Sequence, residues 1–277
     1  MVWKGTMTIL NDGEFSRVWA KNKLLKVDAC QEFSVYGKAR PIVGVCRAYV
    51  YCAQLKHVAD ILKVPVAREA AEVFIQVTDC DAADWRGNII ERQDTFVIDF
   101  DGPVNWEDQM KSKTKNLIRR GLRDNVLIKN ITDETEVRQW YDLYSNTSNV
   151  KKFNQQPWPL IKNIIQNPHW YSLIGAYHNG ELVSGMFFLR GDYPVYWLGG
   201  RRFNGESYSE FCLWSAIKQF QAEAVPLVDL GGAVLEQEHG PTKFKAQFGG
   251  QLKSVFLAGI VNNKWKHRLM PARYRRI

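Results

Sequence analysis

Short apolar stretches separated by polar turns fill the first hundred residues. EFSVYGKA, VGVCRAYVYC, AEVFIQVT and DTFVIDFD are each rich in the β-branched and aromatic residues that favour strands. The helical pattern between them covers residues 57–62. This part of the chain is therefore predicted to form a sheet with few helices.

A helical period replaces this pattern from Trp106 onward. Apolar side chains recur at the spacing of one helical face over 110–122, and lysines and arginines occupy the other faces, which predicts a basic amphipathic helix. A strand over 126–129 follows. Thr132 is expected to cap a second helix, with Asp133 in its first turn. The buried face of that helix is predicted to carry Val137, Trp140, Tyr141 and Tyr144.

The clearest local signal is a pair of apolar runs joined by Asn179-Gly180. This dipeptide suits a tight type I′ turn, so the two runs are predicted to form a hairpin. A strand ending in Gly199-Gly200, a helix over 206–224 and a strand ending in Gly231-Gly232 come next. A crossover of this kind joins parallel strands, whose carboxyl ends open side by side, and ligands favour such openings.

Length, composition and charge narrow the class of protein. The chain of 277 residues suffices for two domains, and 45% hydrophobic with 24% charged residues is a globular composition. The excess of 37 lysines and arginines over 29 aspartates and glutamates favours a polyanionic partner. The sequence lacks a run of about 18 apolar residues and a leader pattern, which predicts a cytoplasmic protein. Its five scattered cysteines lack metal-ligand spacing, so no metal site is predicted.

Taken together, the order of elements resembles the C-terminal domain of FemAB-like acyltransferases. The resemblance rests on a helix pair, a hairpin, a strand ending in Gly-Gly, a helix, and a strand ending in Asp-Leu-Gly-Gly, followed by Phe244-Lys245-x-x-Phe248-Gly-Gly. The segment KSKTKNLIRRGLRDNVLIK (111–129) is also similar to the basic helix and strand that close the first domain in that family. The resemblance covers about residues 95–260.

This resemblance implies an α+β protein with two acetyltransferase-like (GNAT) domains, each a mixed, mostly antiparallel sheet flanked by helices. The expected boundaries are residues 1–110 for the N-terminal domain, 111–129 for the joining helix and strand, and 130–277 for the C-terminal catalytic domain. The implied reaction moves an amino acid from aminoacyl-tRNA, or an acyl group from a thioester, to an amine.

The resemblance also implies that Phe244 and Lys245 lie at the reaction centre. Acyl transfer passes through a tetrahedral state whose oxygen gains negative charge, and a positioned ammonium would stabilise it. Alternatively, Lys245 is a solvated helix residue and Asp229 pairs with a backbone amide at the end of the sheet. Phe244, Lys245 and Asp229 are the predicted catalytic residues. The amine must also lose a proton, and the candidates for accepting it are Asp229, Glu236, Glu238 and His239.

Substrate contacts are predicted from the glycine pairs, and phosphate contacts from the basic helix. Paired glycines at strand ends let a ligand approach backbone amides closely, although a single pair would be read as a turn. Basic side chains on a helix neutralise phosphates, or they form a solvated face. The predicted substrate-binding residues are Gly199, Gly200, Arg201, Gly231, Gly232, Glu236, Phe248 and Gly249, and the predicted tRNA- or phosphate-binding residues are Lys115, Arg119, Arg120 and Arg123.

The acyl donor is the widest choice that the sequence leaves open. Ordinary acetyltransferases hold coenzyme A with a Q/R-x-x-G-x-G/A loop, and RRFNGESYSEF (201–211) matches that pattern only in part. No cofactor is therefore expected, and the basic charge favours aminoacyl-tRNA as donor over acyl-coenzyme A. The expected acceptor is an amine of a cell-wall, capsule or natural-product precursor. Two alternatives are N-acylation of an amino sugar or amino acid from a thioester, and a non-catalytic RNA-binding module.

Overall fold

The computed structural model describes residues 13–23, 26–29, 34–40, 44–53, 58–77, 88–233 and 240–269. Two compact units divide the chain: residues 95–253, here called the site unit, and residues 6–94 with 254–277, here called the terminal unit. Two long strands, β5 (Asn88–Asp99) and β11 (Gln251–Val261), each pass from one unit into the other.

This division differs from the expected boundaries. Residues 111–129, expected to join two domains, lie within the site unit, and residues 254–277 belong with the first part of the chain. The physical reason is strand pairing, because β11 lies antiparallel to β4 (Glu72–Val77), with Phe256 opposite Val77 and Val261 opposite Glu72.

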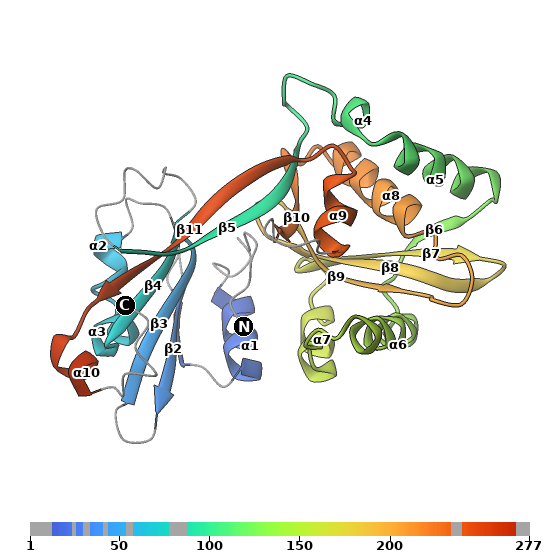
Figure 1. Cartoon of the computed structure of the whole chain (residues 1–277). Coiled ribbons are helices and arrows are strands. Elements are labelled where there is room, and N and C mark those ends of the chain that lie inside the picture. Colours follow the sequence, from blue (N-terminus) through green and yellow to red (C-terminus); the bar gives the residue numbers. More distant parts are fainter. Residues whose placement is uncertain are drawn as a thin grey trace. The chain divides into compact units, whose positions relative to one another are not determined.

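The terminal unit combines a sheet in the order β1-β2-β3-β4-β11 with short helices (Figure 1). Strands β3 and β4 are parallel, whereas β1–β2, β2–β3 and β4–β11 are antiparallel. Its core includes Val50, Ile61, Val73 and Ile75. The elements not yet bounded are α1 (Gly13–Lys23), β1 (Lys26–Ala29), β2 (Ser34–Arg40), β3 (Gly44–Ala53), α2 (Val58–Ile61), α3 (Pro65–Glu69) and α10 (Lys264–Leu269).

Helix α1 is an element that the sequence reading missed. Phe15 and Trp19 are buried one helical turn apart with stacked rings, and Ser16 and Ala20 are buried beside them. The prediction of few helices in this region therefore overlooked an amphipathic one.

The site unit holds the remaining strands of this sheet, in the order β5-β10-β9-β8-β7-β6. Strands β6 to β9 are successively antiparallel, and β9 and β10 are parallel. The strands are β6 (Leu127–Asn130), β7 (Tyr171–His178), β8 (Glu181–Arg190), β9 (Pro194–Arg201) and β10 (Leu227–Ala233), and the helices are α4 (Trp106–Gln109), α5 (Ser112–Arg123), α6 (Glu134–Lys151), α7 (Trp158–Ile165), α8 (Ser209–Ala222) and α9 (Gly240–Ala246).

Two local predictions concern the hairpin and the cap of α6. Asn179 and Gly180 have φ angles of 53° and 79°, as a type I′ turn requires, so the predicted hairpin β7–β8 is confirmed. Asp133, and not Thr132, caps α6: its carboxylate accepts from the backbone N–H groups of Thr135 at 2.9 Å and Glu136 at 3.1 Å. Asp133 is the capping residue because it immediately precedes the helix, where its side chain reaches the exposed amides of the first turn.

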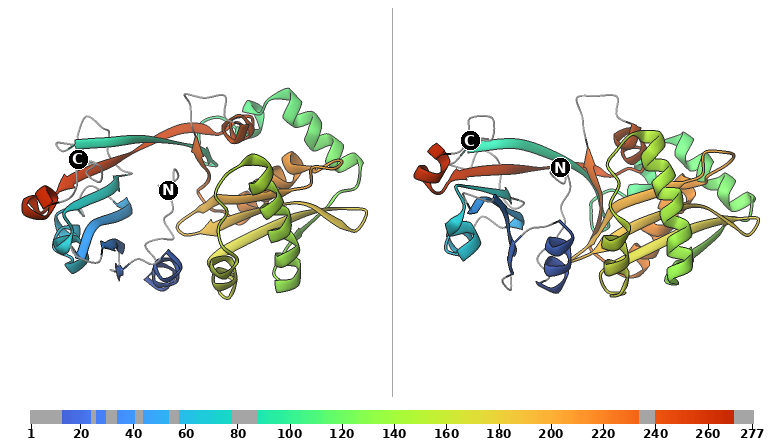
Figure 2. Two further views of the ribbon diagram at one scale, coloured as in Figure 1. Left: turned by 60° about the horizontal axis from the view of Figure 1, so that its bottom comes forward. Right: turned by 90° about the horizontal axis from the view of Figure 1, so that it is seen from below.

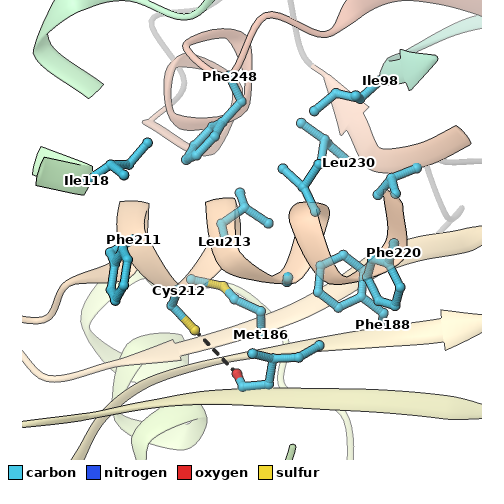
Figure 3. Close-up of a cluster of buried hydrophobic side chains, with 14 of the residues drawn as sticks. Ile98, Ile118, Met186, Phe188, Phe211, Cys212, Leu213, Phe220, Leu230 and Phe248 are labelled. Carbon is cyan, nitrogen blue, oxygen red and sulfur yellow. Dashed lines mark hydrogen bonds between the residues drawn. The ribbon is translucent and has the colours of Figure 1, made fainter. Parts of the chain in front are cut away.

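Helices cover both faces of the sheet in the site unit. Helices α6 and α7 lie together on one face and α5 and α8 on the other, in both views of Figure 2. Trp140 and Tyr144 of α6 are fully buried with stacked rings, as the sequence predicted, and the ring of Trp140 also packs on Phe187 of β8. On the other face, α8 packs in the cluster shown in Figure 3. The predicted α+β class, a mixed sheet flanked by helices, is confirmed.

In the described part of the chain, no helix has the length and apolar character needed to cross a bilayer.

Candidate active site

The centre of the candidate site is the parallel strand pair β9–β10, joined by α8. Asp229 lies opposite Val195, so both strands run toward the same edge of the sheet, as predicted. A β-bulge interrupts β9, because Phe188 pairs with Tyr196 whereas Phe187 pairs with Leu198. Beyond the bulge, a Cβ added at Gly199 would overlap the Tyr196 hydroxyl. The tyrosine side chain therefore lies along its own strand, in space that only glycine leaves open.

Helix α9 brings Lys245 to this edge of the sheet. The Nζ atom donates to the carbonyl oxygen of Gly232 at 3.1 Å and lies 5.8 Å from the ring centroid of Tyr196. A Cβ added at Gly231 would stand 3.2 Å from the same Nζ. The ammonium thus lies beside the carboxyl end of β10 and the ring of Tyr196 in β9.

The pKa of the Lys245 ammonium lies not far above neutral pH. Burial lowers the pKa of Lys245 to about 8, and the negative charge of Asp229 opposes this shift only in part. The group is mostly charged at neutral pH and loses its charge in mildly basic solution. A desolvated cation with few competing waters acts strongly on any charge that develops beside it.

Asp229 is fully buried, and donors already hold one of its carboxylate oxygens. Its Oδ1 atom accepts from the Thr95 hydroxyl and, at 2.6 Å, from the backbone N–H of Gly231. Gly231 has a φ of 79°, and a Cβ there would lie 2.8 Å from the Tyr196 carbonyl oxygen. This geometry favours the structural alternative: Asp229 fixes the end of β10 and provides a counter-charge for Lys245. Its role as proton acceptor stays a prediction.

Phe244 and Phe248 attach α9 to the core. Their rings form an edge-to-face pair with centroids 5.3 Å apart. Phe248 is completely buried among the α8 side chains, as Figure 3 shows, and Phe244 is partly buried. The structure thus places Phe248 in the core rather than at a ligand surface, where it anchors the helix that carries Lys245.

The glycines of the motif divide into two groups. Gly199, Gly231 and Gly232 border Tyr196 or Lys245 and belong to the site. Gly200 and Gly249 serve packing, since a Cβ at Gly200 would come within 2.7 Å of a backbone nitrogen in α6, and one at Gly249 would overlap a backbone oxygen in α4. For these two positions the structure supplies a reason for glycine that needs no ligand.

The four basic residues predicted to bind phosphate differ in the interactions that their side chains already make. Arg120 is held by Glu206 at 2.8 Å and by Asp124 at 3.4 Å, which leaves it poorly placed for phosphate. Arg119 and Arg123 are exposed on the outer face of α5 and make contacts with neighbouring residues of the same segment. Lys115 donates to a backbone carbonyl at 3.4 Å. Phosphate binding by these four residues stays a prediction.

The remaining predicted residues are Arg201 and three residues that lie outside the described chain. Arg201 donates its backbone N–H to Thr147 at 3.0 Å, and its guanidinium lies 4.7 Å from the ring centroid of Phe203. Glu236, Glu238 and His239 lie outside the described residues.

Sequence reasoning missed Tyr196 and Thr95. Tyr196 stood in a strand segment whose aromatic residues looked like ordinary core, and Thr95 is separated from Asp229 by 134 positions. The glycine three residues after Tyr196 was the available signal, because it makes room for the phenol.

Cys212 is a structural residue. Its Sγ donates to the Ile174 carbonyl oxygen at 3.3 Å within the core (Figure 3), and burial raises the pKa of its thiol to about 12. Among the described residues, no cluster of three metal-ligating side chains occurs.

Lys245→Met is expected to stabilise the protein at neutral pH by about 2 kcal/mol. A folded state that lowers the lysine pKa to about 8 disfavours its charge by about 3.4 kcal/mol, at about 1.4 kcal/mol per pKa unit, and loss of the hydrogen bond to Gly232 subtracts about 1 to 1.5 kcal/mol from this gain. The unfolded state keeps its proton up to the ordinary lysine pKa, whereas the folded state releases it near pH 8. Wild-type stability therefore rises with pH between these two values, and the advantage of methionine should shrink there. Urea denaturation at about pH 7 and pH 10 measures both differences.

Lys243, exposed on the same helix, provides the control. Lys243→Met is expected to leave the free energy of unfolding nearly unchanged. A Lys245→Met variant less stable than wild type at pH 7 would contradict the assignment of a net desolvation cost.

Comparison with known proteins agrees with this geometry. The family model for an acetyltransferase (GNAT) domain matches residues 108–246. No curated protein matches the sequence. The crystal structure of FemX is similar, with 11% identity, 91% of this chain and 93% of that chain covered, and a TM-score of 0.70.

Two other solved structures are similar, and one of them is named as a putative lysylphosphatidylglycerol synthetase. The C-terminal domain of the putative enzyme from Agrobacterium fabrum is 13% identical, covering 95% of this chain and 91% of that chain, with a TM-score of 0.61. L-PGS from Bacillus licheniformis is 10% identical, covering 86% and 83%, with a TM-score of 0.55. At these identities the likeness shows the fold, and it confirms the FemAB-like architecture that the sequence predicted. Because the family model spans half of its residues, the chain belongs to the acetyltransferase (GNAT) domain family and is an acyltransferase.

Proposed function

We propose that this acyltransferase moves an aminoacyl group from aminoacyl-tRNA to an amine of a cell-wall, capsule or natural-product precursor. The observation that carries the proposal is the position of Lys245. Its desolvated ammonium lies beside the carboxyl end of β10, 3.1 Å from the Gly232 carbonyl oxygen. A site built in this way suits a reaction in which an oxygen gains negative charge.

The reaction begins when the acceptor amine attacks the ester carbonyl of the donor. A C–N bond forms, and the carbonyl oxygen becomes an oxyanion that the Lys245 ammonium stabilises. An ammonium has three hydrogens, and one of them is directed to Gly232. Collapse of the tetrahedral state breaks the ester C–O bond and releases the tRNA hydroxyl, which takes up a proton, while the new amide nitrogen loses one.

The tRNA donor is supported by charge and by resemblance. The chain carries a net charge of +8, and Arg119 and Arg123 stand on the exposed face of α5. FemAB-like acyltransferases, which the sequence resembles, use aminoacyl-tRNA. The name lysylphosphatidylglycerol synthetase, borne by one similar structure, likewise describes an aminoacylated product.

A thioester donor is the second candidate, and one observation favours it. Tyr208, the residue before helix α8, has a φ of 50° and provides no side-chain cap, so a phosphate could satisfy the first amides of the helix. The same loop contains Glu206, whose carboxylate is paired with Arg120. A carboxylate near the helix entrance opposes phosphate binding, which is why we rank aminoacyl-tRNA first.

A donor assay tests the proposal. The protein is incubated with total aminoacyl-tRNA, labelled on all amino acids, or with acetyl-coenzyme A, and with a mixture of small amines. Label is expected to pass from tRNA into an alkali-resistant amide, which distinguishes transfer from ester hydrolysis. At subsaturating donor, the rate should fall steeply between about 50 and 200 mM salt, because each phosphate contact adds about 0.9 to the logarithmic slope. Consumption of the thioester alone would refute the tRNA donor and support the second candidate.

A further inference from the structure

Helix α10 presents a tryptophan to solvent. Trp265 is 77% exposed, more than any other large hydrophobic residue in the described part of the chain. Lys264 and Arg268 are exposed on the same short helix. Arg268 is a helical neighbour of both Lys264 (i, i+4) and Trp265 (i, i+3), so the indole and the two cations share one side of the helix.

The exposure of Trp265 does not come from a loose helix. Asn263 joins α10 to the terminal unit through a backbone hydrogen bond to Ala71 at 3.2 Å, and Lys266 donates to the Glu69 carbonyl oxygen at 2.7 Å. His267 lies 3.4 Å from the buried carboxylate of Glu72. The inner side of α10 is thus fixed, and its outer side is held in place with the indole outward.

The lysines and arginines around this helix are not balanced by any acidic residue of the same segment. Residues 254–277 contain six lysines and arginines and no aspartate or glutamate. Within the described residues of this segment, Lys264 and Arg268 accompany the tryptophan on the outer side. Such a surface complements a polyanion.

We infer that the outer side of α10, formed by Lys264, Trp265 and Arg268, is an RNA-binding surface that contacts the tRNA donor. Cations bind the phosphates, and the indole stacks on an unpaired base, as aromatic side chains do in proteins that bind single-stranded nucleic acid. A membrane surface fits less well, because helices that lie on bilayers present a broad apolar face, whereas this side of α10 carries one aromatic residue beside two charges.

This inference rests on the proposed function, and it adds a donor contact made by the terminal unit to the chemistry at Lys245 in the site unit. A tRNA is much larger than the ester that reacts, so a second contact raises affinity for the donor without changing the chemistry at Lys245. Loss of the α10 contact should therefore raise KM for aminoacyl-tRNA and leave kcat unchanged.

Binding of uncharged total tRNA, followed by fluorescence anisotropy of a labelled tRNA, tests the surface. Trp265→Ala is expected to weaken binding about 10-fold, in line with the loss of one base–aromatic stack, and Trp265→Phe should retain most of the affinity. The double variant Lys264→Ala/Arg268→Ala is expected to lower the logarithmic salt slope by about 1 to 2. Lys63→Ala is the control, because it removes an exposed lysine of the same unit that is paired with Asp60.

The outcomes separate this inference from the proposed function. If wild type transfers amino acids from tRNA but Trp265→Ala binds tRNA as tightly as wild type, the surface is refuted and the function stands. If wild type neither binds tRNA nor uses its ester, both fail. Binding of phosphatidylglycerol vesicles that depends on Trp265, with unchanged tRNA binding, would assign the surface to a membrane and overturn the inference.

Discussion

Replacing Lys245 by alanine is expected to lower kcat by about 10²- to 10³-fold, the usual loss when one donor to a developing oxyanion is removed. The variant keeps Gly231, Gly232 and Tyr196, so substrate binding should change much less than the rate. Single-turnover transfer at saturating donor and acceptor measures the chemical step directly. Wild-type kcat should also decline as the pH rises above 8, where the ammonium loses its proton.

Controls for this variant come from the same helix. Lys243→Ala removes an exposed lysine two residues away and should retain wild-type activity. Because Lys245→Met is expected to be more stable than wild type at neutral pH, a loss of activity in that variant cannot come from unfolding. A Lys245→Ala enzyme with unchanged kcat, or one that is slow but keeps the decline above pH 8, would remove Lys245 from the mechanism.

The stability and activity predictions for Lys245 have one origin. A cation that is desolvated beside a buried carboxylate costs folding free energy, and the same desolvation strengthens its action on a charge that develops during the reaction. The negative charge of Asp229 offsets part of the desolvation cost of the Lys245 ammonium, but it does not restore the ordinary lysine pKa. The desolvation of Lys245 thus lowers the stability of the folded protein and strengthens the interaction of its ammonium with the charge that develops in the reaction.

The neighbourhood of Lys245 could be predicted because its parts follow one another along the chain. A hairpin, a crossover helix and two strands ending in glycine pairs fix the position of β9 and β10 through local pattern and the geometry of parallel strands. Helix α9 comes soon after β10 along the chain, so Lys245 was expected to lie near the end of β10. Periodicity also located the buried face of α6.

The missed features depend on contacts between distant parts of the chain. Thr95 reaches Asp229 across 134 positions, and β11 returns to pair with β4 near the start of the chain. A local pattern carries no information about such pairings. Phe248 and Gly249 were read as ligand-binding residues because they stand in a motif, whereas their environment, a packed core and a neighbouring helix, appears only in three dimensions.

Gly249→Ala is expected to destabilise the site unit by about 3–5 kcal/mol, a loss found only where packing or backbone geometry is violated. Gly249 has a φ of 79°, and a Cβ there would overlap the Trp106 carbonyl oxygen and come within 3.0 Å of the Gln109 Cβ. A backbone oxygen cannot rotate away as a side chain can, so α4 or the turn after α9 must shift. Urea denaturation measures the loss, and transfer activity should fall with it because the same turn positions α9.

Gly180→Ala separates backbone strain from steric overlap. Gly180 has the same φ of 79°, but a Cβ there would meet no atom within 4 Å. This variant should therefore lose only the cost of a left-handed alanine, about 1–2 kcal/mol. The difference between the two variants isolates the contact with α4. Equal losses would show that Trp106 accommodates the extra carbon, and the close approach of α4 to Gly249 would then have no part in holding Lys245 in place.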